Sequence, residues 1–182
     1  MDTKAFDEFV KRQQEAPSSL GPIDWDEQRR EWLAHLDSLY KRVESFIAKY
    51  VAAGEMIYEY QNIELNEENI GAYIAKQMKL KIGRQIVTLV PIGTLLIGSK
   101  GRVDVVGPIG RAQIILVDKE ASGPASLIHV TVSIGGKTSG TPNRPPKRIN
   151  WEWKIATRPP DIRFEELTQE SFLQLILEVA NG

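Results

Sequence analysis

Residues 95–111, LLIGSKGRVDVVGPIGR, combine glycines with cations, which is the composition of a loop that binds phosphate. A phosphate loop of the Walker type needs Gly-x4-Gly-Lys-Ser/Thr between a strand and a helix, because the helix N-terminus must face the phosphate. Here the order is Gly-Ser-Lys-Gly, and the β-branched run at 102–106 stops at Gly107-Pro108, so no helix starts there. The stretch predicts a hairpin turn at 99–101 with Gly101 at positive φ, and contact with an anion as a second use.

Residues able to act in catalysis are sparse. The chain contains no cysteine, which excludes thiolate nucleophiles, disulfides and cysteine-ligated metals, and its two histidines, His35 and His129, are too few for a histidine-rich metal site. His129 shares a predicted strand with Ser133, but four residues of strand separate them by about 13 Å, too far for a nucleophile and its base. We therefore predict no catalytic residue, metal or cofactor, and expect a non-enzymatic protein; an enzyme with an unrecognised site is the least favoured alternative.

The net charge of −1 hides a strong division along the chain. Residues 1–75 carry 8 Lys/Arg and 15 Asp/Glu, residues 76–158 carry 14 and 4, and residues 159–182 carry 1 and 5. Such asymmetry bears on binding partners. The candidate anion- or partner-binding residues are the cations of the predicted strands and turns: Lys79, Lys81, Arg84, Lys100, Arg102, Arg111, Arg144, Lys147 and Arg148.

Three interpretations of these cations stay open: neutralisation by acidic helices of the same chain, an acidic protein partner, or nucleic acid. Period-two alternation predicts that Lys79 and Lys81 share one face, where they could follow a phosphate backbone. The aromatic residues on which single-stranded nucleic acid stacks are missing from this region, so nucleic acid is not favoured. The lone acids Asp104 and Glu152 are better explained by salt bridges to Arg102, Lys100 or Lys154 than by catalysis.

A long amphipathic helix is the strongest structural signal. Asp24 and Glu27 form a capping-box pattern, and apolar residues then recur at three- and four-residue steps as far as Ala53, with Gly54 after them. The stripe contains Trp32, Leu36, Leu39, Val43, Phe46 and Tyr50. Its width favours packing on a sheet, and a contact of helix 24–53 with a second copy of the chain is the alternative.

The remaining pattern predicts a single α+β domain over residues 1–182, with a meandering antiparallel sheet or partly closed barrel of about six to eight strands. Leu65, Asn66 and Ile70 predict a short helix after the first strand. Gly83-Arg84 predicts a two-residue hairpin turn, and alternation from Ile149 predicts a strand with Trp151 and Trp153 facing inward. Thr168 predicts the cap of a C-terminal helix with Leu167 and Phe172 as its hydrophobic staple. Residues 1–23 form an extension with room for a short helix, a strand is expected at 126–134, and residues 135–147 predict a mobile loop.

The sequence predicts the function and the location of the protein only in general terms. No apolar run approaches the length of a membrane span, and the N-terminus carries no secretory signal, so we expect a cytoplasmic protein without membrane contact. The sequence predicts a binding or protein-interaction module with an unidentified ligand. Nucleic-acid or polyanion binding through region 76–158 is the main alternative.

Overall fold

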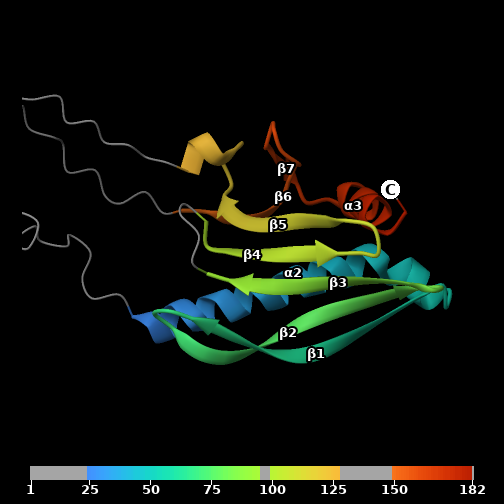
Figure 1. The fold of residues 1–182 in the computed structure, drawn as a ribbon, viewed down its shortest axis with the longest axis horizontal. Helices are drawn as coiled ribbons and strands as arrows, with labels where there is room; N and C mark the ends of the chain where they lie inside the picture. The colour runs from blue at the N-terminus through green and yellow to red at the C-terminus, as the bar shows by residue number, and fades with distance from the viewer. Residues whose placement is uncertain (1–23, 95–98, 128–148, 182) are drawn as a thin grey trace, which may run out of the picture.

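The long helical stretch of the sequence forms α2, Trp25–Ala52, in the computed structural model, which describes residues 24–94, 99–127 and 149–181. The Asp24 side chain accepts a hydrogen bond from the backbone N–H of Glu27 at 3.0 Å, so the predicted N-terminal cap is confirmed. At 1.5 Å per residue, the 28 residues extend about 42 Å. Figure 1 shows α2 running behind the strands along the length of the sheet.

Within the described residues, seven strands form one antiparallel sheet in which each strand pairs with the next in the chain. The strands are β1 Met56–Glu67, β2 Gly71–Ile82, β3 Gln85–Gly93, β4 Gly101–Val106, β5 Arg111–Asp118, β6 Trp151–Ala156 and β7 Phe164–Glu166. A 3-10 turn at Pro124–Leu127 follows β5, and helix α3, Gln169–Ala180, follows β7. The predicted α+β meander is confirmed. The partly closed barrel is wrong, because the order runs from β1 to β7 without pairing between these two edge strands.

The predicted short helix after the first strand is also wrong. Asn66 lies inside β1, and the chain turns at 68–70 directly into β2, so that Glu67 pairs with Gly71 and Leu65 with Tyr73. Leu65 and Asn66 therefore have cross-strand partners in β2, and Ile70 lies in the turn between the strands. Pairing over 12 residues on each side satisfies backbone groups that a single helical turn would leave open.

The β1–β2 hairpin is strongly twisted. Buried positions in β2 shift from odd numbers, Tyr73 and Ala75, to even numbers, Met78 and Leu80, although pairing with β1 continues without a break. Because the buried positions change from odd to even while the strand pairing stays in register, the hairpin must have extra twist at its middle. Figure 1 shows the two strands crossing at that point. The twist lets both halves of β2 bury side chains.

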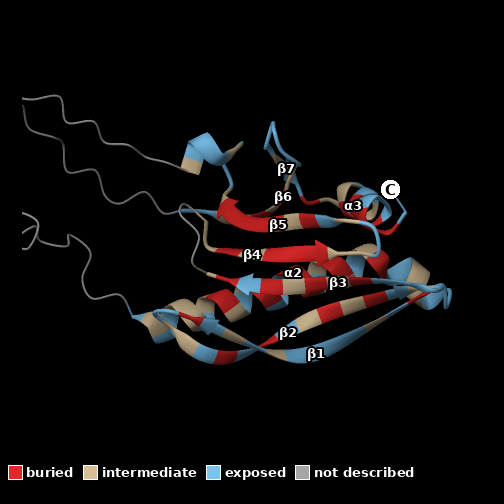
Figure 2. Ribbon diagram, in the orientation of Figure 1, coloured by how far each residue is buried: buried red, intermediate tan, exposed pale blue. Residues whose placement is uncertain are grey.

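The main core lies between the sheet and the two helices. Six residues of α2, among them Trp32, Leu39 and Ile47, are buried in it, as are Phe172 and Val179 of α3. Trp153 packs against Trp32 with ring centroids 6.0 Å apart, which confirms its inward direction. Figure 2 shows the buried residues concentrated in β3–β5, while β1 is mostly exposed. The apolar stripe of α2 therefore packs on the sheet, and association of two chains through this helix stays a prediction.

The cap and staple predicted for the C-terminal helix are confirmed. The Thr168 hydroxyl accepts from the Ser171 backbone N–H at 3.1 Å, and Ser171 Oγ accepts in return from the Thr168 backbone N–H at 2.8 Å. Leu167 and Phe172, on either side of the cap, are both fully buried. This fixes where the chain enters α3 from β7.

Gly101 corrects the expectation of a positive φ. The residue starts β4, and its φ is not in the left-handed region. A Cβ atom added there would lie 2.1 Å from Cζ3 of Trp32, so the reason for glycine is the close approach of the β4 backbone to the indole of α2. The hairpin prediction holds in its coarse form, because strand and not helix follows the turn.

A smaller apolar cluster lies on the opposite side of the sheet. Ile115, Val117 and Ala121 form it, with Ala156 and Phe164 packed against them. Of the predicted strand 126–134, residues 126 and 127 belong to the 3-10 turn. The rest of that strand, the extension 1–23 and the loop 135–147 lie outside the described residues.

Candidate functional site

The sheet surface turned away from the helices carries exposed side chains over β1–β3, and we call this surface the open face. Alternation fixes its members, since their neighbours along each strand point into the core. The open face consists of Ile57 and Glu59 of β1, Lys79 and Lys81 of β2, and Ile86, Thr88, Val90 and Ile92 of β3. Among these, Ile57 is 61% exposed and Ile86 is 52% exposed.

Lys81 lies near the end of β2 that leads into the turn to β3, directly between two exposed isoleucines. It pairs with Ile57 on one side and with Ile86 on the other. Lys79 lies two residues away in the row Glu59, Lys79, Thr88. The prediction that the two lysines share a face agrees with the burial of Met78 and Leu80 between and beside them. Lys81 thus lies between aliphatic side chains, whereas the neighbours of Lys79 across the strands are polar.

Three of the predicted cations have no ion-pair partner in the described part of the chain. These are Lys79, Lys81 and Arg84, and Glu59 lies opposite Lys79 without reaching salt-bridge distance. Arg84 is exposed in the turn between β2 and β3. The open face and this turn therefore carry three cations against one carboxylate, which is an excess of positive charge available to a partner.

The other described cations are held by groups of this chain. Lys100 forms an ion pair with Glu31 of α2, and its Nζ lies 5.5 Å from the ring centroid of Trp151. This pair bears out part of the interpretation that the acidic helices neutralise the sheet. Arg102 and Arg111 both contact Asp104, as described next. Arg144, Lys147 and Arg148 lie outside the described residues.

Asp104 is a buried acid that joins two arginines. It is 2% exposed, its Oδ1 lies 2.9 Å from Nε of Arg102, and its Oδ2 lies 3.5 Å from Nη1 of Arg111. A buried carboxylate needs such partners, because the loss of its hydration costs several kcal/mol. The salt bridge to Arg102 was predicted from the sequence, whereas Arg111 was not. Glu152, the second lone acid, forms no ion pair within the described ranges.

Two cavities lie at the end of the sheet where β5 and β6 meet α3. One, of about 310 Å³, is lined by Ser171, Gln174 and Glu178 of α3 together with β5–β7; the other, of about 250 Å³, is lined by Arg111, Gln113, Pro159 and Ile162. Both are bordered by Ala112, Ala156, Thr157 and Arg158. Arg158 thus stands between them.

No family model, curated protein or solved structure matches this chain.

Within residues 24–94, 99–127 and 149–181, no cluster of three or more histidine or carboxylate side chains could hold a metal ion. Over the same ranges, neither helix combines the length and the apolar character needed to cross a bilayer.

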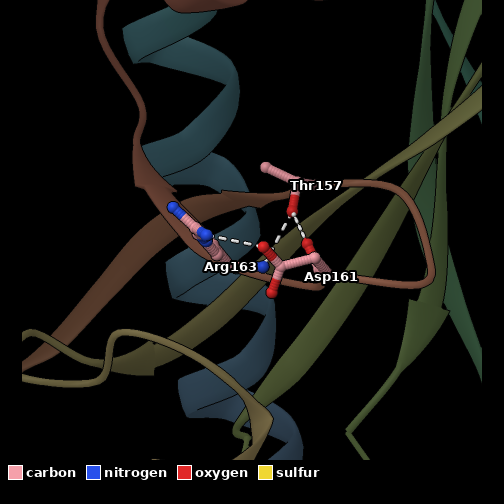
Figure 3. Close-up of polar contacts among 3 residues, drawn as sticks. All are labelled: Thr157, Asp161 and Arg163. Carbon is pink, nitrogen blue, oxygen red and sulfur yellow. Dashed lines mark hydrogen bonds and ion pairs between the residues drawn. The ribbon is translucent and has the colours of Figure 1, made fainter.

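The loop between β6 and β7 forms one wall of the second cavity. The Thr157 hydroxyl donates to the carbonyl of Asp161 at 2.9 Å and accepts from the backbone N–H of Arg163 at 2.7 Å, so one side chain closes the loop (Figure 3). The Arg163 guanidinium adds a 2.6 Å contact to the Asp161 carboxylate. These bonds fix the backbone on which Arg158, Pro159 and Ile162 are carried.

A second buried carboxylate lies at the turn of the β1–β2 hairpin. Glu67 is 8% exposed and accepts hydrogen bonds from the Tyr73 hydroxyl and from the backbone N–H and hydroxyl of Thr94, the latter two at 2.9 and 2.6 Å. A Cβ at Gly93 would lie 2.8 Å from the carboxyl carbon of Glu67, so the strand end fits tightly around the carboxylate. These contacts tie the end of β3 to the hairpin.

Buried phenols make the stability of the protein sensitive to alkaline pH. Burial raises the pKa of Tyr40 and of Tyr73, and the hydrogen bond to Glu67 raises the pKa of Tyr73 further. A raised pKa in the folded state means that the unfolded chain loses these protons first, above about pH 10. The stabilisation is therefore complete below that pH and is lost as the pH rises, by about 1.4 kcal/mol per pH unit for each phenol.

We expect the free energy of unfolding, measured in denaturant at about pH 8 and about pH 11, to fall between the two values. Tyr73→Phe should make this decrease in the free energy of unfolding smaller, because one of the buried phenols is gone. The comparison between the two pH values holds even if the substitution also changes stability at neutral pH. An equal fall in Tyr73→Phe and in the unmodified protein would contradict the prediction.

The sequence did not predict the environment of His35 or the cavities beside Arg158. His35 is half-buried; burial and the nearby Lys100 lower its pKa, while Glu31 opposes them, and its carbonyl accepts from the Trp153 indole N–H at 3.1 Å. His129 and Ser133 lie outside the described residues. Arg158 and the cavities were not anticipated. The available signal was the run Thr157-Arg158-Pro159-Pro160, whose two prolines indicate a turn directly after the strand.

Proposed function

We propose that this protein is a binding module whose open face takes an acidic, partly apolar segment of another protein. The observation that carries the proposal is the position of Lys81 between Ile57 and Ile86, all on one uncovered sheet surface. A partner presenting carboxylates beside aliphatic side chains would satisfy both kinds of group at once.

The apolar part of the surface supports a protein partner. Exposed single hydrophobic residues are common, but here Ile57 of β1 and Ile86 of β3 lie on either side of Lys81, and Ile92 lies farther along β3. Burying one isoleucine side chain contributes about 1.5–3 kcal/mol relative to leaving it in water. Lysine stems can add apolar contact while their ammonium groups reach the carboxylates of the partner.

Nucleic acid is the second candidate, and its support is the surplus of unpaired cations. Beside its lysines the open face carries aliphatic residues, Glu59 and Thr88, and among these residues there is no aromatic ring on which a base could stack. β-branched side chains standing between the cations favour an apolar partner surface over a hydrated phosphate backbone. The protein segment is therefore the better match.

The test measures fluorescence anisotropy of a labelled amphipathic peptide of leucine and glutamate at helical spacing. We expect saturable binding to the full chain that Lys81→Glu weakens by at least about tenfold, or 1.4 kcal/mol, because it converts an attractive charge between the two isoleucines into a repulsive one. Ile86→Ser should also weaken binding, since it removes an apolar contact.

The matched control variant is Lys41→Glu, which changes an exposed lysine on α2, away from the open face. A matched peptide with lysine in place of glutamate should not bind. Equal binding by the Lys81→Glu and Lys41→Glu variants would contradict the proposal. Tight, steeply salt-dependent binding of a single-stranded oligonucleotide, lost in Lys81→Glu while the peptide does not bind, would replace it with the nucleic-acid alternative.

A further inference from the structure

The 250 Å³ cavity beside the β6–β7 loop gathers two arginines with few carboxylates to neutralise them. Arg111 and Arg158 both line it. The Arg158 guanidinium lies against the β4–β5 turn, where a Cβ at Gly110 would be 3.5 Å from its Nη2. Arg111 directly follows this turn, so the structure brings together two guanidinium groups that are 47 residues apart in the sequence.

Each arginine is held by a carboxylate outside the cavity. Arg111 contacts buried Asp104 at 3.5 Å, and Arg158 lies 4.0 Å from Glu178 of α3. Neither contact is a short, bidentate pair, and both arginines are more than half exposed, at 64% and 60% for their side chains. The two carboxylates therefore orient the guanidinium groups and leave further N–H donors of each arginine able to bind an anion.

The local charge sets the kind of anion that fits. Arg102, Arg111 and Arg158 supply three positive charges, and Asp104 and Glu178 supply two negative ones. The surplus of one matches a carboxylate, which carries a single charge, better than a phosphate monoester, which carries about −1.5 to −2 at pH 7. The remaining walls, Ala112, Ala156, Pro159 and Ile162, suit an apolar stem.

We propose that this cavity binds a single carboxylate carried on a short apolar group. The cavity shares Arg111 and Gln113 with the sheet surface that continues from the open face, because the row Lys79, Thr88, Val106, Arg111 crosses β2 to β5. In the complex suggested above, this carboxylate belongs to the bound segment; this part of the inference rests on the proposed function. The cavity is then the anchor at the far end of the same interface.

The first experiment does not depend on the proposed function. N-acetyl-leucine is titrated into the full ¹⁵N-labelled chain, with N-acetyl-leucinamide as the uncharged control. We expect saturable shifts of the Gln113, Thr157 and Ile162 amides with the acid only, and affinity at least about tenfold lower in Arg158→Gln, since a guanidinium–carboxylate contact is a strong, charge-assisted one. Arg30→Gln, which changes an exposed arginine on α2 outside the cavity, should leave the titration unchanged.

Absence of saturable shifts at these amides, equal shifts with the amide control, or equal affinity in Arg158→Gln would overturn the site. The second experiment repeats the peptide measurement in Arg158→Gln, where we expect weaker binding. If N-acetyl-leucine binds and the peptide is lost in Lys81→Glu but not in Arg158→Gln, the carboxylate does not belong to the segment. If N-acetyl-leucine binds and no peptide does, the proposed function fails while the cavity stands.

Discussion

Gly101→Ala is expected to destabilise the protein by about 3 kcal/mol, the upper end of the usual range for overpacking. The new Cβ would meet Cζ3 of Trp32 at 2.1 Å, and Trp32 is fully buried between α2 and the sheet, so its ring has no room to withdraw. Either β4 or α2 must shift, and both carry core residues on the same surfaces. Denaturant unfolding followed by tryptophan fluorescence and by circular dichroism measures the loss.

The matched control is Gly110→Ala. Its Cβ would have ordinary contacts of 3.5–3.6 Å, and its φ is not in the left-handed region, so a change within about 0.5 kcal/mol is expected. Trp32→Leu should also reduce the penalty of Gly101→Ala in a double-mutant cycle, because the ring that the methyl meets is gone. A Gly101→Ala penalty no larger than that of Gly110→Ala, or one unchanged by Trp32→Leu, would contradict the packing argument.

Arg102→Met is expected to cost about 3 kcal/mol of unfolding free energy, because it leaves the buried Asp104 carboxylate with Arg111 alone at 3.5 Å. The loss is not the worth of the salt bridge but the cost of a charge left without its nearest partner. Replacing both residues, Arg102→Met with Asp104→Leu, removes that charge and should return stability to within about 1 kcal/mol of the original protein.

Arg163→Met provides the comparison for an exposed pair. Arg163 and Asp161 are 2.6 Å apart, with both side chains more than two-thirds exposed, so removing this contact should cost less than about 1 kcal/mol. Equal losses in Arg102→Met and Arg163→Met, or no recovery in the double variant, would show that burial of Asp104 does not govern the effect.

The helices flanking the sheet were predictable because their signals are local. Asp24 with Glu27 and Thr168 with Leu167 and Phe172 mark helix starts within a few residues, and the structure places caps at both. The short helix at Asn66 failed for the opposite reason. Leu65, Ile70 and Tyr73 fit a helical face equally well as local sequence, and only pairing of β1 with β2 decides that they belong to a hairpin.

The candidate site was predictable only where alternation applies. Period two placed Lys79 and Lys81 on one face, and the hairpin turn predicted at Gly83-Arg84 sets Ile86 opposite Lys81. Ile57 was not predictable as the neighbour on the other side, because β1 pairs directly with β2 where the sequence predicted a helix. Arg158 was missed altogether. Its position beside the β4–β5 turn depends on pairing of β5 with β6 and on the loop closed by Thr157, which are contacts between distant segments.

The strand order of the sheet has a consequence for how the chain folds while it is being synthesised. Each described strand pairs with the next described strand, so the sheet can assemble strand by strand as the polypeptide emerges. Helix α2, made before all of them, is nevertheless held by the last segments made: the Trp153 indole reaches the His35 carbonyl, and the Arg42 side chain reaches the Leu167 carbonyl at 2.5 Å. A nascent chain that stops short of Leu167 therefore keeps part of its apolar helix surface in water, and a stalled or truncated product of this protein becomes a target for chaperones and proteases.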